Sequence, residues 1–326
     1  MNKEHEPAIA PERSPTVSVI IPTYNRSKTL GDAMASVLSQ SWTDLELIVV
    51  DDGSVEDVEP IVLGLHDPRV KFFRRPKNGG AGAARNSGIA LARGSFIAFH
   101  DSDDLWLPGK LERQMQLMAT LGPAYGVVTG PKILYGRDQK FSFGAGKAAV
   151  APDPATRLVV GGDTLQHLLM DNRISLQNTL FRRNCYPGDV WFDPMARANE
   201  DWEFAVRVAR NTDIYEDTIP VVLGFMSADS ISRNKRRECT GLIRILKKNK
   251  DVLALYPYQH ALLRLDLAHY MYKFGKRRRA IGFLASALRL YPGCVSALGF
   301  MVARWGKGRF AKAWQAIALP RRRRQV

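Results

Sequence analysis

Three carboxylates stand within four residues in the segment GSFIAFHDSDDLWLP, which runs from Gly94 to Pro108. Asp101, Asp103 and Asp104 repel one another, so the cluster is costly unless a cation or hydrogen-bond donors compensate it. Aspartate is also an ordinary turn and N-cap residue, so an acidic turn capping a helix from Pro108 is the alternative. The elements around the cluster must decide between a ligand site and a turn.

Short apolar runs alternate with amphipathic segments in the first half of the chain. The runs that are rich in β-branched or aromatic residues and end in turn residues predict strands at Val17–Asn25, Leu45–Ser54, Val70–Pro76 and Ser95–Asp104. Two helices are predicted between them, with apolar faces formed by Leu30, Met34, Val37 and Leu38 and by Ala84, Ile89, Leu91 and Ala92. The alternation predicts an α/β fold with a mostly parallel sheet and helices on both sides.

Ligands bind such sheets at the carboxyl edge of the strands. The polar residues that end the four runs are Thr23, Tyr24, Asn25, Asp51, Asp52, Arg75, Asp101, Asp103 and Asp104. Because these residues converge on one edge, an acid pair there could hold a divalent cation for a diphosphate through oxygen ligands. Asp52 could accept a hydrogen bond from a base N–H, or it could be a turn carboxylate in DDGS.

The glycine-rich stretch NGGAGAARNSG follows the third predicted strand and gives G-x-G-x-x-R. A dinucleotide fingerprint would follow the first strand and keep its third glycine, so a Rossmann dehydrogenase is discounted. We expect these glycines to let backbone amides at a helix start approach an anionic ligand, with Arg85 as a nearby counter-charge.

The composition is that of a globular chain with a real core: 326 residues, 45% of them hydrophobic. The best apolar stretch, IGFLASALRLYPGCVSALGFMVARW, is interrupted by Arg289, Pro292 and Gly293, so a membrane span is not expected. Residues 1–15 lack a signal-peptide-like apolar core, and we expect a disordered lead and a cytoplasmic protein. The cysteines, Cys185, Cys239 and Cys294, are expected to be free thiols.

The positive charge is concentrated at the C-terminal end. From Ile231 to Val326 the chain has 23 Lys and Arg against three Asp and Glu. Residues 1–230 therefore carry a small net negative charge. This split predicts a near-neutral catalytic or binding domain followed by a cationic segment suited to an anionic surface or partner.

Four motifs in this chain resemble, in order and spacing, family 2 glycosyltransferases of the GT-A fold. They are VSVIIPTYNRSKTL, LELIVVDDGSVEDV, RRPKNGGAGAARNSGIALARGSFIAFHDSDDLWLPGKL and NTLFRRNCYPGDVWFDPMARANEDWEFAVRV. The resemblance covers residues 16–232. It implies an inverting transfer of a sugar from a nucleotide diphosphate donor, assisted by Mn²⁺ or Mg²⁺.

The resemblance also implies residue roles. Pro22, Tyr24 and Asn25 would shape the nucleotide pocket and Asp52 would bind the base. Asp101 would reach the ribose or the metal, and Asp103 would be the principal metal ligand.

The segment ANEDWEFAVRV predicts a helix anchored by Trp202, Phe204, Ala205, Val206 and Val208. Glu200 and Asp201 stand at its start, where the helix dipole favours acids by itself. The resemblance implies that Asp201 is the general base. Glu200 beside it is a second candidate catalytic residue. Inversion requires this base on the face opposite the leaving diphosphate, away from the metal ligands.

The chain departs from the resemblance at one place. Many relatives have an Arg and a His in a pattern like Y-R-x-H-x-x-S-x-S, whereas this chain reads GFMSADSIS, with Phe225 and Ser227 at those positions. Leaving-group stabilisation could therefore depend on cations of the following loop, namely Arg233, Lys235, Arg236 or Arg237, or the activity could be weak.

The basic tail contains two segments, LAHYMYKFGKRRRAIGFLASALRLYPGC and ARWGKGRFAKAWQAIALP, that resemble degenerate tetratricopeptide-like hairpins. Apolar helical faces join Lys and Arg clusters there, with Trp305 and Trp314 available at an interface, which favours an anionic membrane surface. A helical cap with solvated charges is the alternative. No nucleic-acid-binding motif is present, and no nucleic-acid partner is expected.

We therefore expect a disordered lead (1–15), a GT-A domain (16–232) and a basic helical extension (233–326). The domain would have a nucleotide-binding half (16–130) and an acceptor half (131–232). The expected function is a glycosyltransferase of cell-surface polysaccharide synthesis, peripheral on the inner face of the cell membrane. Its donor would be a UDP-sugar and its acceptor a glycan or a lipid-linked glycan.

Two other functions fit the sequence less well. A catalytically silent nucleotide- or glycan-binding module at the membrane would not need both Asp103 and Asp201. A nucleotidyltransferase that makes activated sugars would need a glycine-rich, basic loop after the first strand, and PTYNRS is not such a loop.

Overall fold

A computed structural model of the chain describes residues 14–136, 145–158, 160–196, 198–226 and 235–295. The chain divides into two compact units. The first contains Met1–Thr164 and Asn172–Arg233, and the second contains Leu165–Asp171 and Asn234–Val326. The short segment Leu165–Asp171, expected in the acceptor half, thus groups with the C-terminal helices.

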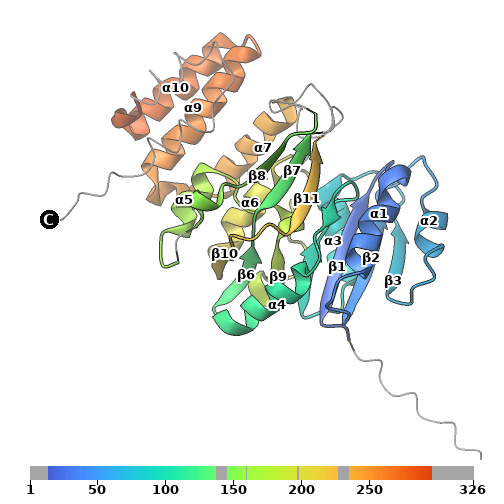
Figure 1. Cartoon of the computed structure of the whole chain (residues 1–326). Coiled ribbons are helices and arrows are strands. Elements are labelled where there is room, and N and C mark those ends of the chain that lie inside the picture. Colours follow the sequence, from blue (N-terminus) through green and yellow to red (C-terminus); the bar gives the residue numbers. More distant parts are fainter. Residues whose placement is uncertain (1–13, 137–144, 159, 197, 227–234, 296–326) are drawn as a thin grey trace, which may run out of the picture. The chain divides into compact units, whose positions relative to one another are not determined.

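The first unit is built on a seven-stranded sheet in the order β10-β6-β9-β4-β1-β2-β3 (Figure 1). Every neighbouring pair is parallel except the two pairs made by β9, which runs antiparallel to β4 and β6. The strands are β1 (Val17–Thr23), β2 (Leu45–Asp51), β3 (Val70–Arg74), β4 (Phe96–Phe99), β6 (Tyr125–Thr129), β9 (Leu180–Arg182) and β10 (Asp213–Glu216). The predicted α/β fold with a mostly parallel sheet is confirmed.

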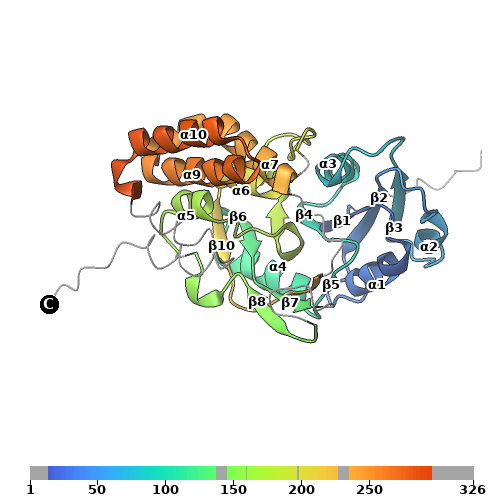
Figure 2. The ribbon, with the colours of Figure 1, turned by 90° about the horizontal axis from the view of Figure 1, so that it is seen from above.

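Helices cover both faces of this sheet, because β1 and β2 are apolar on both sides and almost fully buried. Figure 2 shows α1 and α3 on opposite faces. The helices of the unit are α1 (Ser27–Leu38), α2 (Glu59–Leu63), α3 (Ala81–Leu91), α4 (Lys110–Leu121) and α6 (Glu200–Val208).

The predicted apolar face of α1 is confirmed, since Leu30, Met34 and Val37 are fully buried. The predicted face of α3 is wrong at Leu91, which is exposed at the end of the helix. The predicted Ala84, Ile89 and Ala92 are buried, and the buried face of α3 also contains Gly82, Arg85 and Gly88, which were not predicted to belong to it.

A second, four-stranded sheet in the first unit has the order β5-β11-β7-β8. Its strands are β5 (Leu105–Trp106), β7 (Lys132–Gly136), β8 (Ala148–Ala151) and β11 (Val222–Met226). β5 continues the chain directly after the acidic cluster, and Trp106 and Val222 bury their side chains in the main core. The second sheet therefore fixes the exit of the acidic cluster.

The second unit is helical: α7 (Lys235–Lys248), α8 (Lys250–Leu255), α9 (Pro257–Lys273) and α10 (Arg277–Leu290), with most of α5 (Thr164–Met170). Its core contains Ala261, Leu262, Leu265 and Ala287. Met170 of α5 packs against this core, which explains why that segment groups with the C-terminal helices. Among the described helices, none is long and apolar enough to cross a membrane.

All three cysteines are buried and free, as predicted.

Candidate active site

Asp52 follows β2 and is almost fully buried. Its carboxylate accepts hydrogen bonds from the backbone N–H groups of Gly79 (3.0 Å) and Gly80 (2.6 Å), and it is paired with Arg75. The glycine amides before α3 therefore hold a carboxylate of the protein itself. The turn in DDGS is held by Asp51, whose Oδ1 accepts from the backbone of Ser54 at 3.0 Å, so the turn-carboxylate interpretation of Asp52 is wrong.

Three predicted nucleotide-pocket residues lie at the end of β1 and have different environments. Pro22 pairs with Val50 of β2 within the sheet. Asn25 has a positive φ of 51° and is fixed by its neighbours: its side-chain oxygen accepts from the backbone of Val55 at 2.9 Å. Tyr24 is 45% exposed, which leaves its ring accessible for stacking on a ligand.

The two predicted metal ligands lie in the loop after β4 and remain accessible. The side chain of Asp101 is 30% exposed and that of Asp103 is 39% exposed. Asp103 is paired with Arg26 at 3.4 Å, so the loop after β4 is joined to the end of β1. Arg26 is a contact that the sequence analysis missed, although it directly follows Asn25 in PTYNR.

Asp104, the third acid, is buried and does not share this accessibility. It accepts hydrogen bonds from Gln177 (3.0 Å) and from the backbone N–H of Phe225 (2.9 Å). Burial, followed by the nearby charge of Asp101, raises the pKa of Asp104 to about 7. Asp104 therefore ties the acidic loop to β11 instead of facing a ligand.

The helix after the loop, α4, begins behind Gly109 without a side-chain cap. The acids do form a turn, closed by the backbone bond from Asp104 N–H to Asp101 O, but the predicted alternative that they cap this helix is wrong.

Buried aromatic contacts fix the residues on either side of the acidic loop. His100 packs against Trp106 with ring centroids 5.2 Å apart, and burial lowers its pKa to about 3. Lys110 lies over the same indole at 4.1 Å and donates to Gln114 at 2.6 Å. Burial lowers the pKa of Lys110 to about 7. Both loop ends are therefore anchored in the core.

Arg85 of α3 joins the acidic loop to the second acid group. Its buried guanidinium donates to Asp101 at 3.0 Å and to Glu200 at 3.0 Å, and it lies over the ring of Phe192. Burial opposes its charge, but the negative charges of Asp101 and Glu200 raise its pKa above the ordinary value. Its charge thus balances two acids of the protein, whereas the sequence suggested a counter-charge for a ligand.

Glu200 and Asp201 are the first two residues of α6, as predicted. Asp201 is partly buried, and its carboxylate accepts from Asn172 (2.9 Å) and from the backbone N–H of Trp202 (2.7 Å). Burial, and then the negative charge of Glu200, raise the pKa of Asp201 to about 6. A carboxylate with this pKa is ionised at neutral pH and is a better proton acceptor than an ordinary aspartate.

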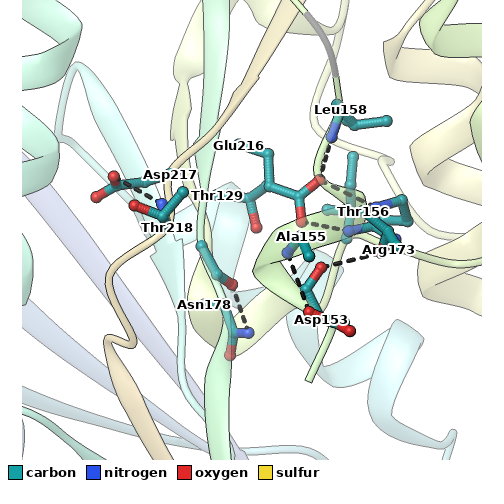
Figure 3. Close-up of polar contacts among 12 residues, drawn as sticks. Thr129, Asp153, Ala155, Thr156, Leu158, Arg173, Asn178, Glu216, Asp217 and Thr218 are labelled. Atoms are coloured by element: carbon teal, nitrogen blue, oxygen red, sulfur yellow. Dashed lines mark hydrogen bonds and ion pairs between the residues drawn. The ribbon is translucent and has the colours of Figure 1, made fainter. Parts of the chain in front are cut away.

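Asn172, another residue that the sequence did not indicate, is held in place by its neighbour Arg173. Arg173 forms a buried two-pronged ion pair with Glu216 at the end of β10, at 3.0 and 2.8 Å (Figure 3). Glu216 also accepts from the backbone N–H of Leu158 at 2.8 Å. This cluster anchors the chain segment that carries the partner of Asp201.

Phe225 and Ser227 are the positions at which the chain departs from the family pattern, and the structure describes only the first of them. Phe225 lies in β11 and packs against Tyr135. Ser227 and Arg233 lie outside the described residues, as do Trp305 and Trp314. Lys235, Arg236 and Arg237 form the exposed first turn of α7 in the second unit.

Oxygen ligands from two accessible carboxylates fit Mg²⁺ or Mn²⁺ bound together with a substrate diphosphate. Within the described residues, no group of three or more His, Cys, Asp or Glu side chains could hold a metal by itself. Asp101 and Asp103 therefore suit a cation that takes its other ligands from the substrate and water.

Residues 18–152 match the profile of glycosyl transferase family 2. Over 102 residues, 31% of this chain, the sequence is 42% identical to the Escherichia coli protein named UDP-Glc:alpha-D-GlcNAc-diphosphoundecaprenol beta-1,3-glucosyltransferase WfgD, of which the match covers 40%. It is 37% identical over 121 residues, 37% of this chain, to the succinoglycan biosynthesis protein ExoO of Rhizobium meliloti and covers 34% of that protein. The matches thus span less than half the length of each relative.

Two solved structures share the fold over most of the chain. S. aureus TarS 1-349 in complex with UDP-GlcNAc has a TM-score of 0.59 at 19% identity, covering 87% of this chain and 83% of TarS 1-349. The mannosyltransferase PcManGT from Pyrobaculum calidifontis, in complex with GDP-Man and Mn²⁺, has a TM-score of 0.58 at 17% identity, covering 96% and 86%. These likenesses identify the GT-A fold.

Replacing Arg85 should destabilise the first unit strongly. In Arg85→Met, Asp101 and Glu200 lose their shared cation, and we expect the free energy of unfolding to fall by about 3 kcal/mol at pH 7. Arg69→Met is the control, because its ion pair with Asp67 is more exposed and should cost at most about 1 kcal/mol. Urea unfolding measures both. Equal losses would contradict the proposed charge balance at Arg85.

Proposed function

Because residues 18–152 match the profile of glycosyl transferase family 2, we propose that the chain is a metal-dependent, inverting glycosyltransferase. It transfers a sugar from a nucleotide diphosphate donor to a glycan or lipid-linked acceptor, in the synthesis of a cell-surface polysaccharide. The observation that carries the proposal is Arg85, which joins an accessible acid of the loop after β4 to the acids that open α6. Two acid groups with different environments are what an inverting displacement requires.

The donor is a nucleotide sugar, with UDP as the first choice. Support comes from the printed names of similar proteins, which mention UDP-Glc for WfgD and UDP-GlcNAc for the TarS complex. The accessible ring of Tyr24 stacks on the base or ribose. Asp52 accepts a hydrogen bond from the base, and this exchanges its present contacts with Gly79 and Gly80 for a ligand N–H.

Asp103 is the principal ligand of Mn²⁺ or Mg²⁺, and Asp101 is the second. The PcManGT complex contains Mn²⁺, which supports a divalent cation here. A cation held by these two carboxylates would supply the positive charge that the leaving diphosphate requires. Arg85 holds Asp101 in place, and Arg26 holds Asp103 through the ion pair described above.

Asp201 is the general base that takes the proton from the acceptor hydroxyl. Asn172 and the backbone of Trp202 orient its carboxylate, and its raised pKa keeps it a strong acceptor while it is still ionised at neutral pH. Glu200 is directed toward Arg85. It therefore supports the catalytic carboxylate by position and charge.

Replacing Asp103 and Asp201 one at a time should separate donor binding from turnover. Asp103→Asn should lose the Mn²⁺-dependent part of UDP-sugar binding, because a neutral amide is a poorer ligand for a hard cation. Asp201→Asn should keep donor binding and lose turnover by about 10²- to 10⁴-fold. Calorimetric titration and a product assay measure the two effects, with the exposed Asp189→Asn as control.

The raised pKa of Asp201 means that folding disfavours its charged form at neutral pH, so Asp201→Asn should not lower the melting temperature at pH 8. Near wild-type transfer by Asp201→Asn would exclude it as the base. Donor binding without any turnover by the wild type would instead favour a silent binding module.

The acid limb of the pH profile should report Asp201. Because the base must be ionised and its pKa lies at about 6, kcat/KM should fall about tenfold per pH unit below pH 6 and be level above it. Initial rates at saturating donor and limiting acceptor, measured from pH 4.5 to 8, give kcat/KM for the acceptor and therefore this profile. A limb near pH 4, the range of an unperturbed aspartate, would contradict the proposed environment of the base.

We also propose that the second unit attaches the enzyme to the cytoplasmic face of an anionic membrane. The described helices expose a basic cluster, Lys276–Arg279, at the start of α10, and their acidic residues are few: Glu238, Asp251 and Asp266. Each Lys or Arg near an anionic leaflet contributes on the order of 1 kcal/mol, so a handful on one face suffices.

Vesicle co-sedimentation across a salt series tests this attachment. Binding should be confined to anionic lipid, weaken as salt rises, and fall in the triple variant Arg277→Gln, Arg278→Gln, Arg279→Gln. Because these three side chains are exposed, the variant should fold as the wild type does. Equal partitioning onto neutral vesicles, or no binding at low salt, would mean that the helices are a structural cap.

A further inference from the structure

The second sheet has one face that is apolar throughout the described strands. The register places Leu223 of β11 opposite both Leu105 of β5 and Ile133 of β7, and Ile133 opposite Val150 of β8. Residues at alternate positions complete this outer face, which comprises Leu105, Ile133, Tyr135, Ala148, Val150, Leu223 and Phe225. No charged side chain is among them.

The outer face is exposed at Tyr135, Ala148 and Val150 and half-buried at Leu105, Ile133, Leu223 and Phe225. The opposite face is packed where β5 and β11 meet the main core. Trp106 and Val222, which point the other way, are buried in the main core. On the outer face Tyr135 is 39% and Val150 is 43% exposed. Figure 2 shows β7 and β8 at the rim of the first unit, and none of its labelled helices lies beyond them. Among the described elements, β8 packs closely on β7 alone.

This apolar face begins at the candidate active site. Leu105 directly follows Asp104, and the backbone N–H of Phe225 donates to Asp104 at 2.9 Å. Phe225 and Tyr135 form an edge-to-face pair, with ring centroids 6.3 Å apart, at the carboxyl end of β11 and β7. The aliphatic side chains lie further along the strands, so the face runs from acids through aromatic rings to purely aliphatic residues.

The size of the face decides between a protein and a small apolar partner. Four strands about 4.8 Å apart, three of them with four or five residues and β5 with two, at about 3.3 Å per residue, give an area of roughly 250 Å². A stable dimer buries about 800 Å² per partner, and acidic or basic partners find no counter-charge here. A strip of this size matches an uncharged hydrocarbon chain.

We infer that the outer face of the second sheet binds the hydrocarbon chain of a lipid-linked acceptor. The acceptor's polar head then lies at the carboxyl end of β7 and β11, and its reacting hydroxyl extends from there to Asp201. Phe225 and Tyr135 contact the first part of the lipid, and Ile133, Val150 and Leu223 contact the rest. This inference rests on the proposed glycosyltransferase function and assigns the lipid to a surface of its own.

The probes that test it are farnesyl phosphate and isopentenyl phosphate, which carry the same head on a long and a short chain. Calorimetry below the micellar range should give at least about tenfold tighter binding of farnesyl phosphate, because the longer chain buries more apolar carbon. Val150→Asn should remove most of this difference, since it places an amide on the aliphatic part of the face. Leu63→Asn is the matched control, an exposed leucine on α2.

Both substitutions lie on the surface, where effects on stability are usually small. An equal affinity for the two probes, or a chain-length difference that survives in Val150→Asn, would overturn the inference. So would a loss of self-association in Val150→Asn by sedimentation velocity, which would make the face an interface between two copies. Titration of a UDP-sugar with Mn²⁺ is run in parallel: its failure would count against the proposed function, while the prenyl phosphate result tests the lipid surface by itself.

Discussion

The ion pairs of Arg85 are the contacts on which the candidate site depends. One buried guanidinium on α3 lies between Asp101, from the loop after β4, and Glu200, from the start of α6. Without that cation, the neighbouring carboxylates of Asp101, Glu200 and Asp201 would repel one another. The small residues of α3, Gly82 and Gly88 among them, allow this helix to pack closely enough for its arginine to reach both acids.

Further buried contacts hold in place the loop after β4 and the start of α6, which Arg85 connects. The ion pair of Arg173 and Glu216 anchors the segment that brings Asn172 to Asp201. Asp104 fastens the metal loop to β11 through the backbone of Phe225. A base and a metal ligand positioned in this way need little rearrangement at the moment of reaction, which is the physical advantage of a preorganised site.

Periodicity and strand-ending residues were enough to predict the mostly parallel sheet, its first four strands along the chain and the place of the acidic loop. Contacts between distant segments were not predictable: Asn172 lies in a stretch without a clear pattern, and no local signal connects Arg173 with Glu216. Arg85 was singled out, but the sequence could not show that its charge is balanced by two acids. The prediction that Leu91 is buried was wrong because an apolar residue in the last turn of a helix can fit the helical period and still face water.

The account separates a leaving-group side, at Asp101 and Asp103, from a base side at Asp201. The most direct test is a crystal structure with Mn²⁺ and an unreactive UDP-sugar analogue, in which anomalous scattering locates the metal. The account predicts Mn²⁺ at about 2.0–2.3 Å from an oxygen of Asp103. It also predicts the Asp201 carboxylate on the face of the anomeric carbon opposite the diphosphate. A metal bound away from the loop after β4, or Asp201 on the same face as the diphosphate, would contradict it.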